Sequence, residues 1–188
     1  MIKIGVTGSV ASGKTTASKI IASRRGPLFS ADRIVKKLYT QNKFKRLLAR
    51  KLSLKFDKNF KKNLKNKVLK KKEILRKLEK IIHPLVRREM FVFLTSNKNK
   101  SFLFFEIPLL IESKLTKYFD VLIFIKSKNN LRLKRYILKG GNIQLFSLLD
   151  KHQIKDTKKM KLCDHIVVNN KSLSILKKKL SNIIKLYE

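Results

Sequence analysis

The sequence predicts an α/β fold with a largely parallel sheet that carries helices on both faces. Short apolar runs alternate along the chain with segments whose apolar residues recur at helical spacing. This alternation is typical of parallel strands joined by crossover helices. A lysine-rich helical segment of about 50 residues interrupts the alternation after the second run, and we expect it to form an insertion.

The first elements surround a loop that contains two glycines. Residues 2–6 form an apolar run and predict a strand. From Lys14 onward, apolar residues recur at helical spacing until Gly26-Pro27 ends the helix. Residues 27–30 predict a second strand, and residues 31–39 predict a second helix.

The inserted segment, residues 44–94, has helical character, and we expect Pro84 to break or kink it. Beyond it, residues 102–107 and 121–125 are nearly continuous apolar runs. Runs of this kind predict strands that are covered on both faces.

In the last third of the chain, residues 131–138 predict a helix, and residues 143–161 have only weak periodicity. Residues 166–168 predict the last strand, and Ser172 is expected to cap a terminal helix. The residues expected to face inward from that helix are Leu173, Leu176, Leu180, Ile183, Ile184 and Tyr187.

Composition excludes several classes of protein. Hydrophobic residues make up 43% of the 188 residues, which is enough apolar surface for a folded core. The one cysteine, Cys163, excludes a disulfide scaffold. The most apolar run, residues 102–111, contains Glu106 and is too short to span a membrane. Since no signal peptide is recognised, we expect a soluble, cytoplasmic protein with no membrane partner.

The net charge of +35 comes from 47 Lys and Arg against 12 Asp and Glu. One interpretation is a nucleic-acid partner. The other is solvated helix faces that steer anionic ligands in general. The densest stretch, residues 43–80, lacks the interleaved aromatic residues that single-strand binders use. We therefore expect no specific nucleic acid, although charge alone does not separate the two interpretations.

Residues 8–15, GSVASGKT, match the phosphate-loop pattern G-x-x-x-x-G-K-[ST]. The glycines let successive N–H groups point at phosphate oxygens, and the following helix adds its positive dipole end. Lys14 is expected to reach the β- and γ-phosphates of ATP, and the Thr15 hydroxyl to ligate Mg²⁺. The motif predicts a three-layer P-loop NTPase fold. The residues expected to contact ATP here are Gly8, Ser9, Val10, Ala11, Ser12, Gly13, Lys14, Thr15 and Thr16.

Asp32 follows the second predicted strand. We expect it at the carboxyl edge of the sheet, where open α/β sheets bind ligands. A carboxylate there can orient an attacking hydroxyl and accept its proton late in phosphoryl transfer. The alternative is that Asp32 only caps the helix over residues 31–39.

Further motifs follow in order along the chain. They are Ser30-Ala31-Asp32, Ile81 to Arg87 (IIHPLVR), Ile107 to Glu112 (IPLLIE), Leu133-Lys134-Arg135 and Cys163 to Asn170 (CDHIVVNN). With these motifs and the phosphate loop, the chain from Val6 to about Leu173 resembles the dephospho-CoA kinase family. The combination of His-Pro-Leu with Pro-Leu-Leu-x-Glu is the most specific part of the resemblance.

The resemblance implies phosphoryl transfer from ATP to the 3′-hydroxyl of the dephospho-CoA ribose, the final step of coenzyme A biosynthesis. It implies that Asp32 is the base, that Thr7 and Lys14 belong to the same catalytic centre, and that Arg135 stabilises the transferred group. It also places Asn169 near the adenine of ATP. The residues it implies for acceptor binding are Asp32, His83, Arg87, Pro108, Leu109 and Glu112.

The resemblance also implies a division of the chain. The nucleotide-binding core would comprise residues 1–36, 97–130 and 159–188, the CoA-binding helical domain residues 37–96, and the lid residues 131–158. Each implied role has a plainer alternative, since Arg135 fits a solvated helix charge and His83 fits a histidine at a helix end.

Three positions and one turn depart from the family's usual pattern, the turn being Gly140-Gly141-Asn142 in place of a more acidic lid turn. Ser30 replaces the first Asp of an Asp-Ala-Asp segment, Lys139 stands where a second lid arginine is common, and Val168 replaces a frequent Asp. Lysine keeps the charge of arginine but loses its bidentate geometry. The remaining catalytic candidates are present, so we expect an active enzyme.

Two other functions stay open from the sequence. One is another small-molecule P-loop kinase, which would act on a nucleoside or a nucleoside monophosphate. The other is a basic nucleic-acid-binding module that uses ATP incidentally. For the oligomeric state we expect a monomer or a weak homo-oligomer.

Overall fold

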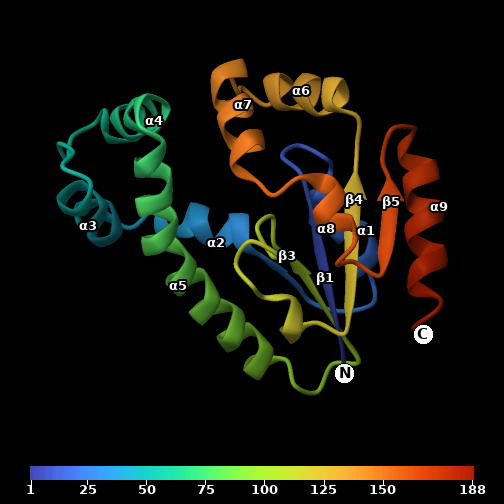
Figure 1. Cartoon of the computed structure of the whole chain (residues 1–188). Coiled ribbons are helices and arrows are strands. Elements are labelled where there is room, and N and C mark those ends of the chain that lie inside the picture. The colour runs from blue at the N-terminus through green and yellow to red at the C-terminus, as the bar shows by residue number, and fades with distance from the viewer. The chain divides into compact units, whose positions relative to one another are not determined.

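The computed structural model describes the whole chain, residues 1–188, except for the side chain of Lys72. It divides the chain into two compact units (Figure 1). The first unit comprises residues 1–30 and 93–188, and the second comprises residues 31–92.

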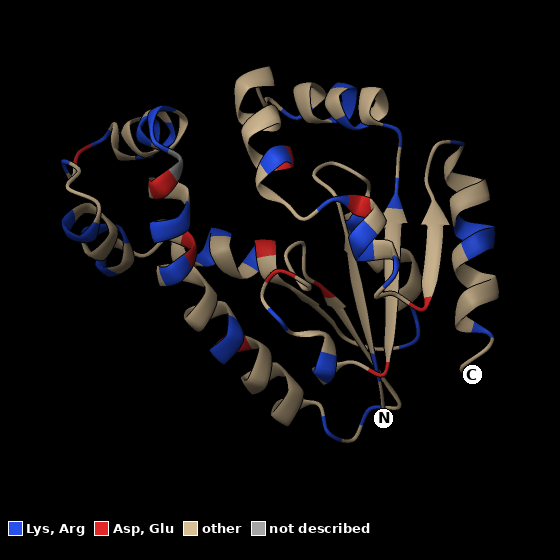
Figure 2. Cartoon of the chain, viewed as in Figure 1, with Lys and Arg blue, Asp and Glu red and all other residues tan. Residues whose placement is uncertain are grey.

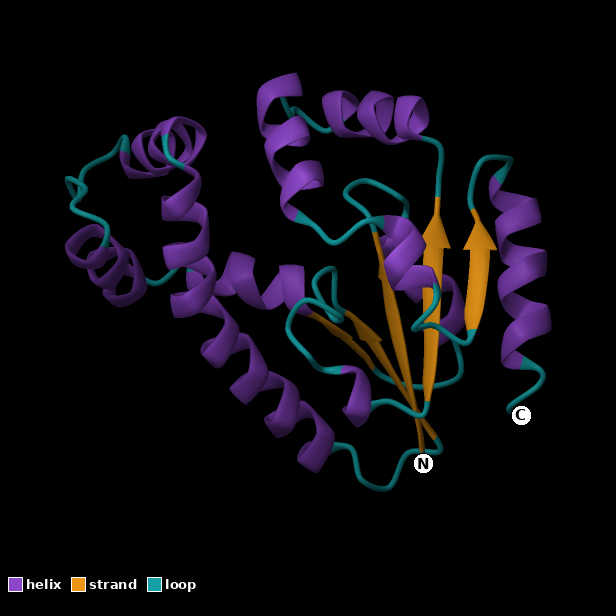
Figure 3. Ribbon diagram, in the orientation of Figure 1, coloured by secondary structure: helices purple, strands orange, loops and turns teal.

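The first unit contains a five-stranded sheet in which every pair of neighbouring strands is parallel (Figure 3). The strands are β1 (Ile2–Gly8), β2 (Leu28–Ser30), β3 (Phe102–Glu106), β4 (Val121–Lys126) and β5 (His165–Val168). They lie in the order β2-β3-β1-β4-β5, so the first strand of the chain is the central one. The predicted parallel α/β sheet is confirmed, with strand bounds shifted by one or two residues.

The helices of the first unit connect the strands or follow the last of them in the sequence. They are α1 (Lys14–Ala22), α6 (Asn129–Leu138), α7 (Ile143–His152), α8 (Asp156–Met160) and α9 (Leu173–Ile184), with a short 3₁₀ turn at Thr116–Tyr118. The segment with weak periodicity, residues 143–161, therefore forms two helices.

One face of the sheet packs against α1 and α9. Ile4 and Val6 of β1 lie in one buried cluster with Ile21 of α1 and Leu180 of α9. Ser172 caps α9 by accepting a hydrogen bond from the backbone N–H of Ile175, as predicted.

The prediction that Leu173 faces inward is wrong, because its side chain is 61% exposed. Leu173 shares a helical face with Leu176, but it is the first residue of α9, and the buried cluster begins one turn later at Leu176.

The opposite face of the sheet is built around phenylalanine side chains. Phe105 lies 5.9 Å from Phe29, 5.3 Å from Phe93 and 5.1 Å from Phe119, measured between ring centroids. Gly5 of β1 faces this layer, and a Cβ atom there would lie 2.8 Å from Leu110 Cδ1. A larger residue at this position would therefore have to displace the Leu110 and Leu122 side chains.

The second unit is helical. It contains α2 (Ala31–Leu38), α3 (Asn42–Lys51), α4 (Phe60–Lys70) and most of α5 (Lys72–Ser96), whose last four residues belong to the first unit. Its buried apolar residues include Phe44, Leu48, Leu52, Phe60, Leu64, Val68, Ile74, Leu75 and Ile82. Figure 2 shows Lys and Arg along α3, α4 and α5.

Of the two alternatives expected for Pro84, the break is wrong, because α5 continues through it, and the kink stays a prediction. Pro84 has no N–H to donate to the carbonyl of Lys80, so the helix lacks that one hydrogen bond. The helical turns on both sides supply enough bonds to keep the element continuous.

Among the helices of the described chain, none combines the length and the apolar character that crossing a membrane requires.

Candidate active site

The phosphate loop connects β1 with α1 and depends on both of its glycines. Gly8 has φ +148°, and a Cβ atom there would lie 2.4 Å from the carbonyl oxygen of Ile125. Gly13 has φ +100°, and its Cβ would lie 2.2 Å from Nδ2 of Asn169. Both positions therefore exclude other residues by backbone conformation and by space.

The Lys14 side chain is buried against this loop. Its Nζ atom donates hydrogen bonds to the carbonyl oxygens of Gly8, at 3.0 Å, and Ser9, at 2.7 Å. The ammonium group is thereby held over the loop, whose geometry is suited to binding phosphate.

A buried carboxylate, Glu106, joins the loop to the end of the neighbouring strand. Its Oε1 atom accepts a hydrogen bond from the Thr15 hydroxyl at 2.5 Å, and Oε2 accepts one from the Ser30 hydroxyl at 2.7 Å. Glu106 is 1% exposed. Sequence analysis gave this residue no role, although a lone acid at the end of an apolar run was a usable signal.

Asp32 lies in the first turn of α2, two residues after Ser30 ends β2, and its side chain is exposed. The chain connection ties it to the carboxyl end of β2. Ser30, which stands where the family usually has an acid, donates to Glu106 instead of carrying a charge itself.

Arg135 and Asn169 lie against the phosphate loop. Nη1 of Arg135 donates to the carbonyl of Ser12 at 3.4 Å and to the hydroxyl of Ser127 at 3.0 Å, and Nη2 donates to the carbonyl of Asn169 at 3.1 Å. The amide of Asn169 donates to the same Ser12 carbonyl at 2.9 Å. These contacts exclude the interpretation of Arg135 as a purely solvated helix charge.

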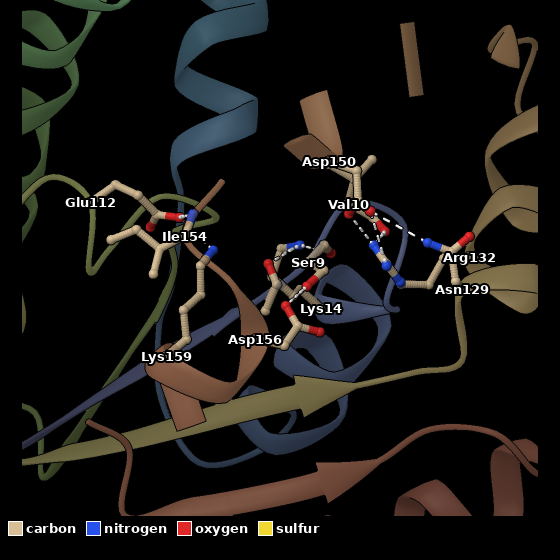
Figure 4. A network of polar contacts seen from close by, with 11 residues as sticks. Ser9, Val10, Lys14, Glu112, Asn129, Arg132, Asp150, Ile154, Asp156 and Lys159 are labelled. Carbon is tan, nitrogen blue, oxygen red and sulfur yellow. Dashed lines mark hydrogen bonds and ion pairs between the residues drawn. The ribbon is translucent and has the colours of Figure 1, made fainter. Parts of the chain in front are cut away.

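A second arginine of α6, Arg132, contacts the loop as well (Figure 4). Its guanidinium forms an ion pair with Asp150 of α7 at 2.5 Å and donates to the Val10 carbonyl at 3.4 Å. It also lies 5.6 Å from the centroid of the Phe146 ring. Arg132 is buried and the Asp150 side chain is 26% exposed, so this half-buried pair connects α6, α7 and the loop.

Two further acidic side chains, one of them at the loop, have protein partners (Figure 4). Asp156 of α8 accepts a hydrogen bond from the Ser9 hydroxyl. Glu112 pairs with the fully buried Lys159 at 2.5 Å and accepts from the backbone N–H of Ile154 at 3.1 Å. Glu112, which the resemblance places among the acceptor-binding residues, is therefore paired with a cation of the chain itself.

The other predicted residues are placed as follows. Thr7 is fully buried and donates from its hydroxyl to the Pro108 carbonyl at 3.1 Å. Pro108 and Leu109 are half-buried in the segment after β3.

His83 and Arg87 lie four residues apart on α5, the first half-buried and the second exposed. The structure therefore brings together the candidates for ATP binding, whereas Asp32, His83 and Arg87 belong to the other unit.

Cys163 is half-buried rather than part of the core. Burial, together with the charge of Asp164, raises the pKa of its thiol to about 11, although Lys159 acts in the opposite direction. A thiol of this kind stays protonated at neutral pH and makes a poor nucleophile.

The oxygen atoms near Thr15 fit Mg²⁺. Magnesium prefers hard oxygen ligands and is usually bound by one or two protein groups together with substrate phosphates. The Thr15 hydroxyl and the Glu106 carboxylate supply such atoms at the phosphate loop. Among the described side chains, no group of three or more His, Cys, Asp and Glu residues is placed to hold a metal.

A phosphate loop after the central strand of a parallel sheet, with arginines from a following helix against it, defines a P-loop kinase. Within that class, the chain belongs to the dephospho-CoA kinase family, whose profile matches residues 2–174. The family uses ATP to phosphorylate dephospho-CoA in the final step of coenzyme A biosynthesis, and the chain is an enzyme of this family.

Individual relatives agree with this assignment. The chain is 30% identical to a dephospho-CoA kinase of Rickettsia felis, covering 98% of this chain and 96% of the relative. It is 33% identical to one of Fusobacterium nucleatum, covering 94% and 93%. A solved structure, dephospho-CoA kinase from Campylobacter jejuni, is 26% identical and superposes with a TM-score of 0.64 over 97% of this chain and 95% of that one.

Proposed function

We propose that this chain transfers the γ-phosphoryl group of ATP to the 3′-hydroxyl of the ribose of dephospho-CoA. The bond between the 3′-oxygen and the γ-phosphorus forms, the bond from the γ-phosphorus to the bridging oxygen breaks, and ADP leaves. The observation that carries the proposal is the intact phosphate loop, with Lys14 held over it, in a chain of this family.

In this proposal, the backbone N–H groups of residues 8–15 and the ammonium of Lys14 bind the triphosphate. Thr15 and Glu106 would hold Mg²⁺, which would supply positive charge to the triphosphate. The contacts that support this are the hydrogen bond between Thr15 and Glu106 and the burial of the carboxylate. Asn169 lies at the loop and borders the nucleotide.

Asp32 orients the 3′-hydroxyl and accepts its proton as the new bond forms. Arg135 stabilises the charge on the transferred group, and its three hydrogen bonds to the loop and its surroundings support this position. The helical unit binds the acceptor with His83 and Arg87, and Pro108, Leu109 and Glu112 border the acceptor from the first unit. Thr7 fixes the segment after β3 through the Pro108 carbonyl.

The test is a kinase assay with the purified chain, ATP, Mg²⁺ and dephospho-CoA, in which the product is identified by mass. We expect coenzyme A and ADP in equal amounts. Nucleosides and nucleoside monophosphates serve as competing acceptors. If one of them is phosphorylated faster than dephospho-CoA, that compound and not dephospho-CoA is the substrate. Assays with and without Mg²⁺ test the metal, and light scattering tests the proposed monomer or weak homo-oligomer.

A further inference from the structure

The helical unit, which the proposed function assigns to acceptor binding, contains a basic cavity of about 620 Å³ whose lining residues have been given no individual role. Its volume is in the range of small-molecule sites. All of its lining residues belong to residues 31–92, from the end of α2, from α3 and from α5. The cationic lining residues are Lys43, Arg46, Arg50 and Arg88, against one acid, Glu89. None of the ion pairs seen in the described part of the chain joins these cations to a carboxylate.

The same cavity has an apolar part. Leu38, Phe44, Leu47 and Leu85 line it beside the cations, and Phe44 is 4% exposed. A cavity that combines apolar side chains with several convergent polar groups is typical of a site for an organic ligand. The excess of cations indicates that the ligand is an anion.

The first turn of α3 adds a second, independent feature. The cavity is lined by Gln41, Lys43 and Phe44, which surround the start of this ten-residue helix. No side chain caps that end, and its first turn contains no acid. The free N–H groups and the positive end of the helix dipole therefore favour a bound phosphate at this point.

The cavity lies on a different face of α5 from the proposed acceptor residues. Leu85, Arg88 and Glu89 line it and share one helical face, because they are spaced three and four residues apart. His83 and Arg87 share another face, about half a turn away at 3.6 residues per turn. The cavity therefore does not include His83 and Arg87, the two residues of this unit that are proposed to bind the acceptor.

We propose that this cavity binds a small organic phosphate that carries at least two phosphoryl groups and an apolar part. Arg50 and Arg88 hold the phosphoryl groups by charge-assisted hydrogen bonds, and the start of α3 binds one of them through its backbone. Two sources have this chemistry: the diphosphate and pantetheine arm of dephospho-CoA itself, or a separate molecule. The first source rests on the proposed function, and the second does not.

The test uses inorganic diphosphate as the probe and isothermal titration as the measurement. The full-length chain is first saturated with ADP, so that residues 8–15 are occupied. We expect one diphosphate to bind, and Arg50→Glu to weaken it by about tenfold or more. Lys51→Glu is the matched control, because it makes the same change in net charge one residue away and Lys51 does not line the cavity. Thermal melting of both variants verifies that they are folded.

The inference is overturned if diphosphate fails to bind, or if Arg50→Glu and Lys51→Glu weaken it equally, since that would show general attraction to a basic surface. A second titration with dephospho-CoA present separates the sources. Competition, with a raised KM for dephospho-CoA in Arg50→Glu and an unchanged KM for ATP, assigns the cavity to the acceptor's arm. Binding beside dephospho-CoA assigns it to a separate molecule. A wild-type chain that makes coenzyme A but does not bind diphosphate here would overturn this inference alone.

Discussion

The hydroxyl of Thr15 donates to the carboxylate of Glu106 at 2.5 Å, which joins the start of α1 to the end of β3. The sheet register explains why they meet. Glu106 is opposite Val6 of β1 on one side and Ser30 of β2 on the other. The last residue of β3 therefore lies between the strand that leads into the phosphate loop and the strand that leads toward Asp32.

Replacing Glu106 with glutamine should raise the Mg²⁺ concentration needed for half-maximal activity by about 10- to 100-fold, the usual effect of losing a group that supports a metal ligand. Glutamine keeps the shape of the side chain and can still bond to both hydroxyls, so the fold should survive. The measurement is kinase activity against Mg²⁺ concentration. Ser30→Ala is the control, because it removes one hydroxyl and keeps the carboxylate. An unchanged Mg²⁺ requirement in Glu106→Gln would remove Glu106 from the metal site.

The Asp32→Asn variant should bind ATP normally and lose phosphoryl transfer, because the phosphate loop is untouched while the proton acceptor is lost. Single-turnover kinetics with dephospho-CoA measure the transfer, and equilibrium titration with ATP measures binding. Arg33→Gln, at the next position of α2, is the control for a general effect of removing a charge. Near-native turnover by Asp32→Asn would show that Asp32 only caps the helix.

Arg135→Ala should lower kcat on the order of 10³-fold, because a charge that stabilises the transferred group in the transition state is removed. Arg135 also bonds to the Ser12 and Asn169 carbonyls, so Arg135→Lys separates charge from positioning. Lysine retains the charge and should recover part of kcat. The exposed neighbour Lys134 provides the control variant Lys134→Ala. A change confined to KM would place Arg135 in ground-state binding.

The Cys163 thiol should react slowly with iodoacetamide near neutral pH, and its rate should rise until about pH 11, because burial raises its pKa to that value. Since the native chain keeps a proton that the unfolded chain releases from about pH 9, the free energy of unfolding should fall between pH 9 and 11. Alkylation rates and urea melts at several pH values measure both effects. Cys163→Ser separates this contribution from those of Lys and Tyr. Rapid alkylation at pH 8 would contradict the burial of the thiol.

Much of the first unit could be predicted from sequence, because buried parallel strands produce continuous apolar runs and the phosphate loop has a fixed spacing. The helix through Pro84 could not, because one missing hydrogen bond competes with packing along the whole of a 25-residue helix. The pairing of Arg132 with Asp150 was also hidden. The segment around Asp150 has weak periodicity, and no local pattern shows which of many cations an acid will meet.

Glu106 illustrates a different limit. Its position inside an apolar run is visible in the sequence, but its contacts with Thr15 and Ser30 depend on a register between strands that are far apart in the chain. Local patterns predict strands and do not predict their order. The hydrogen bonds to the Ser12 carbonyl from Arg135 of α6 and from Asn169, which follows β5, depend on the same tertiary arrangement.

Because β1 is the central strand, it is synthesised on the ribosome long before the two strands that pair with it. The strand that leads into the phosphate loop is made first, but its partners, β3 and β4, begin only at Phe102 and Val121. Until those residues emerge, its apolar side chains have no sheet to join, and contacts of such long sequence separation form slowly. We therefore expect the chain to expose unpaired apolar strand surface, which favours aggregation, until β3 and β4 have been synthesised.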